Sequence, residues 1–235
     1  MDMLAEEKDF GGESRMRVIE LHKSVTESND RDAEVLRQEL KEKGIFLINI
    51  MSSAGSGKTT FLAKTIEMLE DRSKVAVLEC DIDSDVDALR IAALGAKAIQ
   101  VHTDGMCHMD AGMTRTSIEE CETEGVEIAF LENIGNLICP AEYDTGAVKN
   151  VMILSVPEGD DKPLKYPLMF EKSDVLILSK IDALPYFNFD MDKCVERVKR
   201  LNKDIQIFPL SAKSGDGVDA WMNWLKEENR KFREG

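Results

Sequence analysis

The chain has 235 residues, of which 43% are hydrophobic and 32% are charged, and its formal net charge at pH 7 is -15. This length suits one domain around a single core, and the composition excludes an intrinsically disordered or fibrous protein. The acidic balance, without a cluster of lysines and arginines, excludes a nucleic-acid partner, and no apolar run approaches the roughly 20 residues of a membrane-spanning helix.

The N-terminal segment predicts a tail followed by a helix. Its first residues are acidic and lack the apolar core of a secretory signal, so we expect a cytoplasmic protein. Residues 1–16 are expected to form a disordered tail. Apolar residues then recur at helical intervals, which predicts a helical arm over residues 17–44 that ends at Gly44 and is interrupted near Ser28, Asn29 and Asp30. Residues 45–235 are expected to form the main domain.

After Gly44, short apolar runs alternate with helical patterns almost to the C-terminus. Continuous apolar runs of this length are typical of buried parallel strands. They occupy residues 45–51, 74–80, 96–101, 126–131, 151–156, 174–179 and 205–210, and a closing helix is expected to start near Asp216. The alternation predicts an α/β fold, a mostly parallel sheet with helices on both faces, whose ligands bind at the carboxyl ends of the strands.

A phosphate-binding motif follows the first predicted strand. Residues 52–59, SSAGSGKT, match the pattern GxxxxGK[ST] except that Ser52 takes the place of the first glycine. Backbone N–H groups and the positive end of the following helix would receive phosphate oxygens, Lys58 would reach the β and γ phosphates, and Thr59 would bind Mg²⁺. The predicted phosphate-binding residues are Gly55, Ser56, Gly57, Lys58, Thr59 and Thr60.

Two later motifs indicate that the nucleotide is a guanine nucleotide. Residues 179–182, SKID, resemble the [NT]KxD motif of GTPases, although Ser179 stands where that family has Asn or Thr. The resemblance implies that Asp182 accepts hydrogen bonds from the guanine N1 and 2-amino groups, and that the stem of Lys180 lies over the ring. The second motif of the same families is resembled by Ser211, Ala212 and Lys213.

An acidic residue closes the predicted strand at residues 126–131 and is followed by a glycine three positions later. Glu132 to Gly135, ENIG, resembles the ExxG variant found in the metallochaperone GTPases of the SIMIBI class, where other GTPases carry DxxG. The resemblance implies that Glu132 senses the Mg²⁺ shell and Gly135 the γ-phosphate. Asp81 is the expected acidic partner near Mg²⁺, and Lys58, Asp81 and Glu132 are the expected catalytic residues.

Three further segments resemble the HypB family of GTPases. They are residues 107–110, CHMD, residues 132–141, ENIGNLICPA, and residues 158–167, EGDDKPLKYP, and the likeness extends over about residues 18–225. The resemblance implies a GTP-dependent homodimer that binds Ni²⁺ during maturation of [NiFe]-hydrogenase. A HypA-like nickel chaperone and the hydrogenase large-subunit precursor are the implied partners.

The five cysteines are odd in number and spread through the chain, which indicates reduced thiols. The resemblance implies that Cys107, His108 and Cys139 bind Ni²⁺ or Zn²⁺, which thiolate and imidazole ligands suit. These three donors do not complete a tetrahedral site in one chain, so we expect a site shared across a two-fold axis. Cys139 follows Glu132 by seven positions, which links the metal to the nucleotide sensor. The other cysteines are expected to fill apolar space.

The sequence leaves other functions open. One is a related SIMIBI GTPase, such as the urease accessory protein UreG or the chaperone of methylmalonyl-CoA mutase, although UreG-like chains carry Cys-Pro-His. Another is a small-molecule P-loop kinase, which would need a lid with arginines that the segment after Pro157 lacks. A third is a GTP-binding scaffold with weak hydrolysis, suggested by Ser52 and Ser179.

Overall fold

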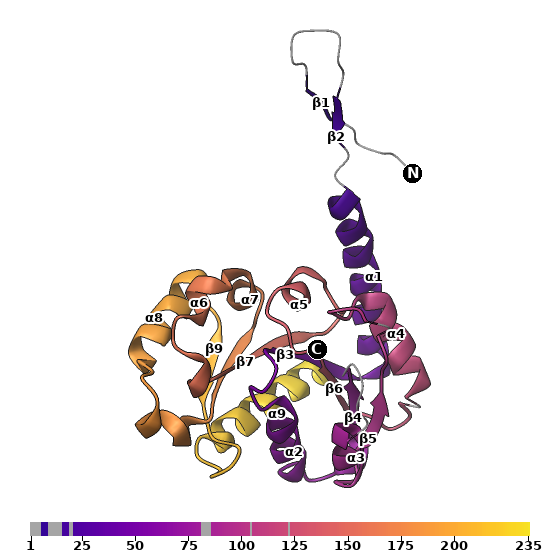
Figure 1. The fold of residues 1–235 in the computed structure, drawn as a ribbon. Helices are drawn as coiled ribbons and strands as arrows, with labels where there is room; N and C mark the ends of the chain where they lie inside the picture. The colour runs from indigo at the N-terminus through magenta and orange to yellow at the C-terminus, as the bar shows by residue number, and fades with distance from the viewer. Residues whose placement is uncertain (1–5, 9–15, 19–20, 81–85, 104, 122) are drawn as a thin grey trace.

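The computed structural model of the chain describes residues 6–8, 16–18, 21–80, 86–103, 105–121 and 123–235. Within these residues, seven strands form one parallel sheet with the order β5-β4-β6-β3-β7-β8-β9 (Figure 1). The strands are β3 (Phe46–Ser52), β4 (Val75–Glu79), β5 (Lys97–Gln100), β6 (Ile128–Glu132), β7 (Lys149–Ser155), β8 (Val175–Ser179) and β9 (Gln206–Pro209). The predicted strands and the predicted α/β fold are confirmed.

Helices connect these strands and cover both faces of the sheet. The α-helices are α1 (Leu21–Lys43), α2 (Lys58–Glu67), α3 (Val86–Ala92), α4 (Ala111–Glu120), α5 (Cys139–Glu142), α6 (Lys162–Lys165), α7 (Pro167–Glu171), α8 (Met191–Leu201) and α9 (Val218–Glu234). Short 3₁₀ helices are η1 (Arg72–Lys74), η2 (Val156–Glu158) and η3 (Ile181–Tyr186). None of the described helices is both long and apolar enough to cross a lipid bilayer.

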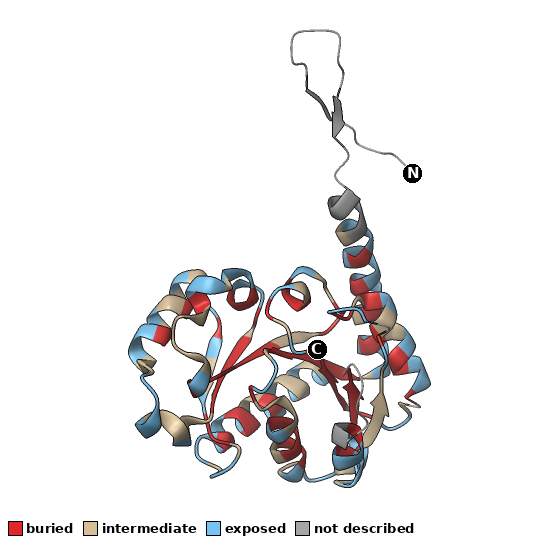
Figure 2. Ribbon diagram, in the orientation of Figure 1, coloured by how far each residue is buried: buried red, intermediate tan, exposed pale blue. Residues whose placement is uncertain are grey.

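The five inner strands of the sheet are largely buried, which explains why they are continuous apolar runs, whereas the edge strands β5 and β9 are partly exposed (Figure 2). Phe46, Ile48 and Ile50 of β3 pack on one face against α2 and α9, where the indole N–H of Trp221 donates to Thr65 Oγ1 at 3.0 Å. On the other face, the intervening Leu47 packs with α1 and α4. Farther along this second face, α5, α7 and α8 cover β7 and β8. The helices cover the two faces of the sheet, and the carboxyl ends of its strands are followed by loops.

The N-terminal arm differs from its prediction. Helix α1 begins at Leu21, because Met16–Val18 forms a short strand, β2, that pairs antiparallel with β1 (Glu6–Lys8). The predicted interruption near Ser28, Asn29 and Asp30 is wrong, since all three lie within α1. Asn29 is tolerated there because its side-chain amide donates to Asp144 O at 2.8 Å and its oxygen accepts from Ala111 N at 3.0 Å. Tertiary hydrogen bonds thus outweigh the weak helix propensity of this segment.

The turn before α9 depends on a glycine that has no room for a side chain. Gly217 has φ 73°, and a Cβ added to it would overlap the carbonyl oxygen of Pro209. Gly215 has a similar φ of 90° but open space around it. We expect Gly217→Ala to lower the free energy of unfolding by about 3 kcal/mol and Gly215→Ala by only about 1–2 kcal/mol, because the second substitution brings the left-handed strain without the clash. Urea denaturation measures both, and equal losses would contradict the packing argument.

Candidate functional site

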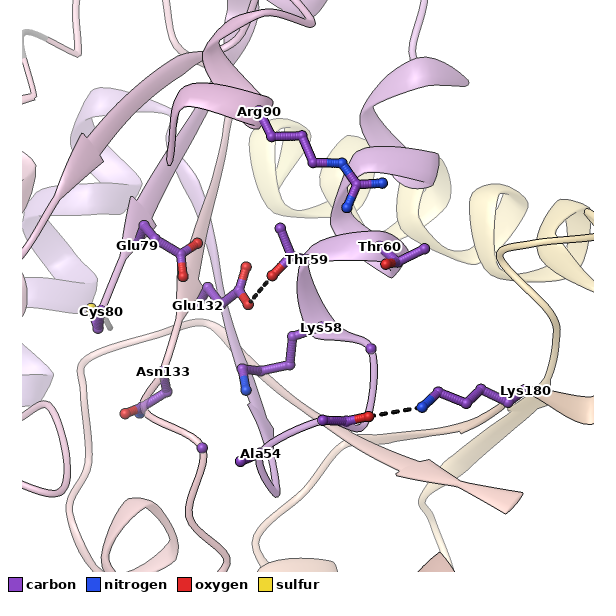
Figure 3. A pocket seen from close by; sticks show the side chains of 13 residues that line it. Ala54, Lys58, Thr59, Thr60, Glu79, Cys80, Arg90, Glu132, Asn133 and Lys180 are labelled. Carbon is purple, nitrogen blue, oxygen red and sulfur yellow. Dashed lines mark hydrogen bonds between the residues drawn. The ribbon is translucent and has the colours of Figure 1, made fainter. Parts of the chain in front are cut away.

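A cavity of about 460 Å³ lies at the carboxyl ends of β3, β4 and β6. Figure 3 shows its lining: Ala54, Gly55, Gly57, Lys58, Thr59, Thr60, Glu79, Cys80, Arg90, Glu132, Asn133, Gly135 and Lys180. We call it the P-loop cavity. Most of the predicted phosphate-binding residues therefore line one cavity together with Glu132 and Gly135 of the ENIG motif. Ser56 does not line it, because its side chain is buried beneath the loop.

The phosphate loop has the backbone that its glycines predict. Gly55 and Gly57 have φ values of 75° and 101°, and Gly57 precedes the first residue of α2, so the loop opens directly on a helix N-terminus. Ser52 replaces the expected first glycine without strain, since Lys180 is the only non-glycine residue with positive φ in the described part of the chain. The Ser52 hydroxyl accepts from Ser56 Oγ at 2.6 Å and donates to Ser53 O at 2.8 Å.

Two buried carboxylates stand beside the phosphate loop. Glu132 is 2% exposed and accepts a hydrogen bond from Thr59 Oγ1 at 2.9 Å, and Glu79 lies opposite it on β4 and is 3% exposed. Hydroxyl and carboxylate oxygens are the donors that Mg²⁺ prefers, so Thr59 and Glu132 fit the predicted ion. Asp81, also predicted here, lies outside the described residues. The sequence analysis missed Glu79, although an acid at the end of an apolar strand was the available signal.

The ENIG motif, residues 132–135, packs directly against the phosphate loop. A Cβ added to Gly135 would lie 2.9 Å from Ala54 N and 3.0 Å from Ala54 Cα, which are backbone atoms. The segment from Glu132 to Gly135 is held from behind by buried amides: Asn133 Nδ2 donates to Asn49 Oδ1 at 3.1 Å, and Asn49 Nδ2 donates to Asn150 Oδ1 at 3.0 Å. If this segment moved, it would therefore press on the phosphate loop or pull away from it.

This contact gives a test of the site. We expect Gly135→Ala to displace the phosphate loop or the 132–135 segment and to weaken nucleotide binding by about tenfold or more, because small misplacements at such sites are costly. Gly112→Ala is the control, since its Cβ would make only an ordinary contact with the Asp110 side chain at 3.5 Å. Titration with a fluorescent guanine nucleotide measures both, and equal affinities would show that the Gly135 contact is not tight in solution.

The predicted guanine-reading residues are brought together beside the P-loop cavity. Ser211 Oγ donates to Asp182 Oδ1 at 2.7 Å, which orients the carboxylate. Lys180 Nζ donates to Gly55 O at 2.8 Å, and Ser179 Oγ donates to Ser56 O at 3.1 Å, so both residues tie this motif to the phosphate loop. Ser179 thereby has a structural role despite its departure from the family pattern. Asp182, Ser211, Ala212 and Lys213 do not line the cavity itself.

The predicted metal ligands form a cluster in one chain. The donor atoms of Cys107, His108 and Cys139 all lie within 4.8 Å of one another, and Cys107 Sγ donates to Cys139 Sγ at 2.7 Å. His108 is buried and stacks on Tyr143, with ring centroids 3.7 Å apart. Asn136 Nδ2 donates to Cys107 O at 3.5 Å and joins the two ligand-bearing loops. Tyr143 was not singled out from the sequence, and Asn136 was quoted only as part of the 132–141 segment, with no role of its own.

Protonation of this cluster affects metal binding in two opposite ways. Burial lowers the pKa of the His108 imidazole below its ordinary value, which keeps the ring neutral and able to donate a lone pair. The hydrogen bond to Cys139, and secondly burial, raise the pKa of Cys107. Binding of a cation at Cys107 must therefore displace a proton. The other cysteines, Cys80, Cys121 and Cys194, are buried as expected, and burial raises the pKa of Cys194 to about 12.

One continuous segment runs from the P-loop cavity to the cysteine cluster (Cys107, His108 and Cys139), to which it contributes Cys139. Glu132 ends β6, Gly135 contacts the phosphate loop, and Cys139 begins α5. Ile138, between them, is 55% exposed, and its N–H donates to Asn136 Oδ1 at 2.9 Å. Because few residues separate the two sites, we expect a shift of the segment at one end to change the position of Cys139 at the other.

Comparisons with known proteins agree with this site. Residues 46–209 match the family model described as CobW/HypB/UreG, nucleotide-binding domain. The hydrogenase maturation factor HypB of Azotobacter chroococcum is 43% identical over 92% of this chain and 71% of its own length. The structure of HypB from Helicobacter pylori in complex with nickel is 36% identical, with a TM-score of 0.81 over 87% of this chain and 96% of that one.

A more distant structure shows the wider fold class. The signal recognition particle 54 kDa protein of Aeropyrum pernix, solved with GDP, has a TM-score of 0.52 at 13% identity over 83% of this chain and 49% of that one, which shows a shared fold. The match of the family model to most of the chain, and the identity to HypB over nearly all of it, decide the assignment. The chain belongs to the HypB family of P-loop proteins.

Proposed function

We propose that this chain is a GTP-hydrolysing nickel metallochaperone, which binds Ni²⁺ at a dimer interface and delivers it during [NiFe]-hydrogenase maturation. The observation that carries the proposal is the single segment that joins Glu132, beside the phosphate loop, to Cys139 in the cysteine cluster. The 132–139 segment would then link the bound nucleotide to the affinity for the metal. A cytoplasmic location remains a prediction from the sequence, and a HypA-like nickel chaperone and the hydrogenase large-subunit precursor remain predictions from the family.

In this proposal the P-loop cavity binds GTP. Asp182, oriented by Ser211, accepts from the guanine ring, and Lys58 neutralises charge on the β and γ phosphates. Mg²⁺ would be held by Thr59 with Glu132, and by Asp81 as predicted, and would neutralise charge on the phosphates. Hydrolysis is an in-line attack of water on the γ-phosphate, and slow turnover resets the switch.

The cysteine cluster binds the cargo. Cys107, His108 and Cys139 offer three donors, which leaves one position of a four-coordinate site for a second copy of the chain or for the recipient protein. Exposed apolar side chains, Met106 and Ile138, stand next to the ligands, and their burial would favour a homodimer at this face. Order in the 132–139 segment would then depend on GTP, so the dimer would be GTP-dependent.

A GTP and ATP turnover assay tests the nucleotide part of the proposal. We expect Mg²⁺-dependent hydrolysis of GTP and none of ATP above background. Hydrolysis of ATP with transfer to a small molecule would support the kinase alternative. GTP binding without hydrolysis would support the scaffold alternative, in which only the bound nucleotide matters.

The enzyme that receives the nickel has two candidates, of which [NiFe]-hydrogenase is the first. A relative from Helicobacter hepaticus, 37% identical over 89% of this chain, is named as a hydrogenase/urease maturation factor. A different nickel enzyme is therefore the second candidate client. Nickel content of purified hydrogenase and urease, compared in cells with and without this chain, separates the two.

A further inference from the structure

Arg90 on α3 is a cation in the P-loop cavity that no motif identifies. Its side chain lines the cavity together with Thr59 and Thr60, and α3 contacts α2. Figure 3 shows its guanidinium extending over the start of α2. An arginine within an amphipathic helix has no sequence signature, which is why only the structure reveals this position.

The P-loop cavity needs positive charge to bind a nucleoside triphosphate, because its lining already contains buried carboxylates. Two buried carboxylates, Glu79 and Glu132, line the cavity, and a nucleoside triphosphate would add several negative charges to it. Among the described residues, the lining supplies three cations, Lys58, Lys180 and Arg90. Lys180 is bound to the carbonyl oxygen of Gly55. This leaves Lys58 and Arg90 to balance the phosphates, and the planar guanidinium can bind two phosphate oxygens at once.

The strand order tells which phosphate Arg90 would reach. The base-reading side chains follow β8 and β9, on one side of β3. Arg90 lies in the connection between β4 and β5, on the other side of β3, and lines the cavity together with Glu79 at the end of β4. A nucleotide whose base lies near Asp182 and whose β and γ phosphates lie at Lys58 and Thr59 therefore extends its terminal phosphate toward Arg90.

We propose that Arg90 binds the γ-phosphate of GTP from within its own chain and acts as a catalytic residue that stabilises charge on the γ-phosphate during hydrolysis. This inference rests on the proposed GTPase function. It makes the site selective for the triphosphate, because the guanidinium would lose this ionic contact when the γ-phosphate has left. The 132–139 segment and α3 then respond to the same phosphate from two sides.

Steady-state and single-turnover hydrolysis of GTP by Arg90→Ala and Arg90→Lys, in the full chain, test the inference. We expect Arg90→Ala to lower kcat/KM by about 10- to 100-fold, with Arg90→Lys in between, since arginines that stabilise this transition state have large effects. Affinity for GDP should stay within about threefold of wild type, because GDP lacks the phosphate that Arg90 binds. Arg200→Ala is the matched control, since Arg200 is an exposed helix arginine paired with Glu196 on α8.

Two results would overturn the inference. One is a kcat/KM and an affinity for a GTP analogue that both remain within about twofold of wild type in Arg90→Ala. The other is recovery of turnover when Arg90→Ala is mixed with Lys58→Ala, which would show that the arginine acts across a dimer. If the wild-type chain itself hydrolyses no GTP, the proposed function fails first, and that outcome is separate from failure of Arg90. Circular dichroism of each variant confirms that the fold is retained.

Discussion

Replacing Cys139 with alanine should lower the affinity of the chain for Ni²⁺ by about 100-fold or more and reduce the bound metal at equilibrium. Cys107→Ala should do the same, because each substitution removes one of three donors that lie within 4.8 Å of one another. Loss of a direct ligand is expected to cost more than loss of a supporting contact, which typically costs about 10- to 100-fold. Competition against a chelator of known affinity measures the change.

The control for this prediction is another cysteine of the same chain. Cys121 is buried at the end of α4 and is not part of the metal cluster, so Cys121→Ala should leave the Ni²⁺ affinity and stoichiometry unchanged. Zn²⁺ should follow the same pattern, since thiolate and imidazole bind both ions. Unchanged metal stoichiometry in both Cys107→Ala and Cys139→Ala would refute the ligand assignment.

The second large effect is expected at the base-reading aspartate. Asp182→Asn should weaken GTP binding by about 100-fold or more, because an amide cannot accept both hydrogen bonds from the guanine N1 and 2-amino groups, and unpaired buried polar groups discriminate strongly. The same variant should gain affinity for xanthosine triphosphate, in which an oxygen replaces the 2-amino group and accepts from the new amide. Nucleotide competition binding measures both affinities.

Two further variants make this result specific. Ser211→Ala removes the hydroxyl that orients the Asp182 carboxylate at 2.7 Å, so it should weaken GTP binding by a smaller factor than Asp182→Asn. Asp219→Asn is the matched control, since Asp219 lies on the exposed first turn of α9. If Asp182→Asn binds GTP as the wild type does, the base does not lie against Asp182.

The sheet could be predicted from the sequence because its five inner strands are largely buried. Parallel strands of this kind are continuous apolar runs, and the run at residues 45–51 corresponds to β3 (Phe46–Ser52) with an offset of one residue. The helical arm was harder to predict. The polar stretch at Ser28–Asp30 favours a break by local propensity, and only contacts with distant residues such as Asp144 keep it helical.

The site could be predicted in part, for a different physical reason. The residues of the phosphate loop and the segments that carry the cysteine cluster form short motifs in the sequence, and these motifs can be recognised without a structure. Arg90 and Glu79 reach the cavity through the order of the strands, which places β4 and α3 beside the phosphate loop. No short sequence motif shows that these two residues lie beside the phosphate loop. Asp182 and Ser211 were both predicted as base-reading residues, but only the folded structure shows the hydrogen bond between them.

Coupling of the nucleotide to the metal through one segment is tested most directly by the Ni²⁺ affinity of the chain in two nucleotide states. With Mg²⁺ present, the dissociation constant for Ni²⁺ should differ by about tenfold between the chain bound to a non-hydrolysable GTP analogue and the chain bound to GDP. The difference should shrink in Gly135→Ala, which disturbs the contact between the segment and the phosphate loop. Equal Ni²⁺ affinities in the two states of the wild-type chain would contradict the coupling.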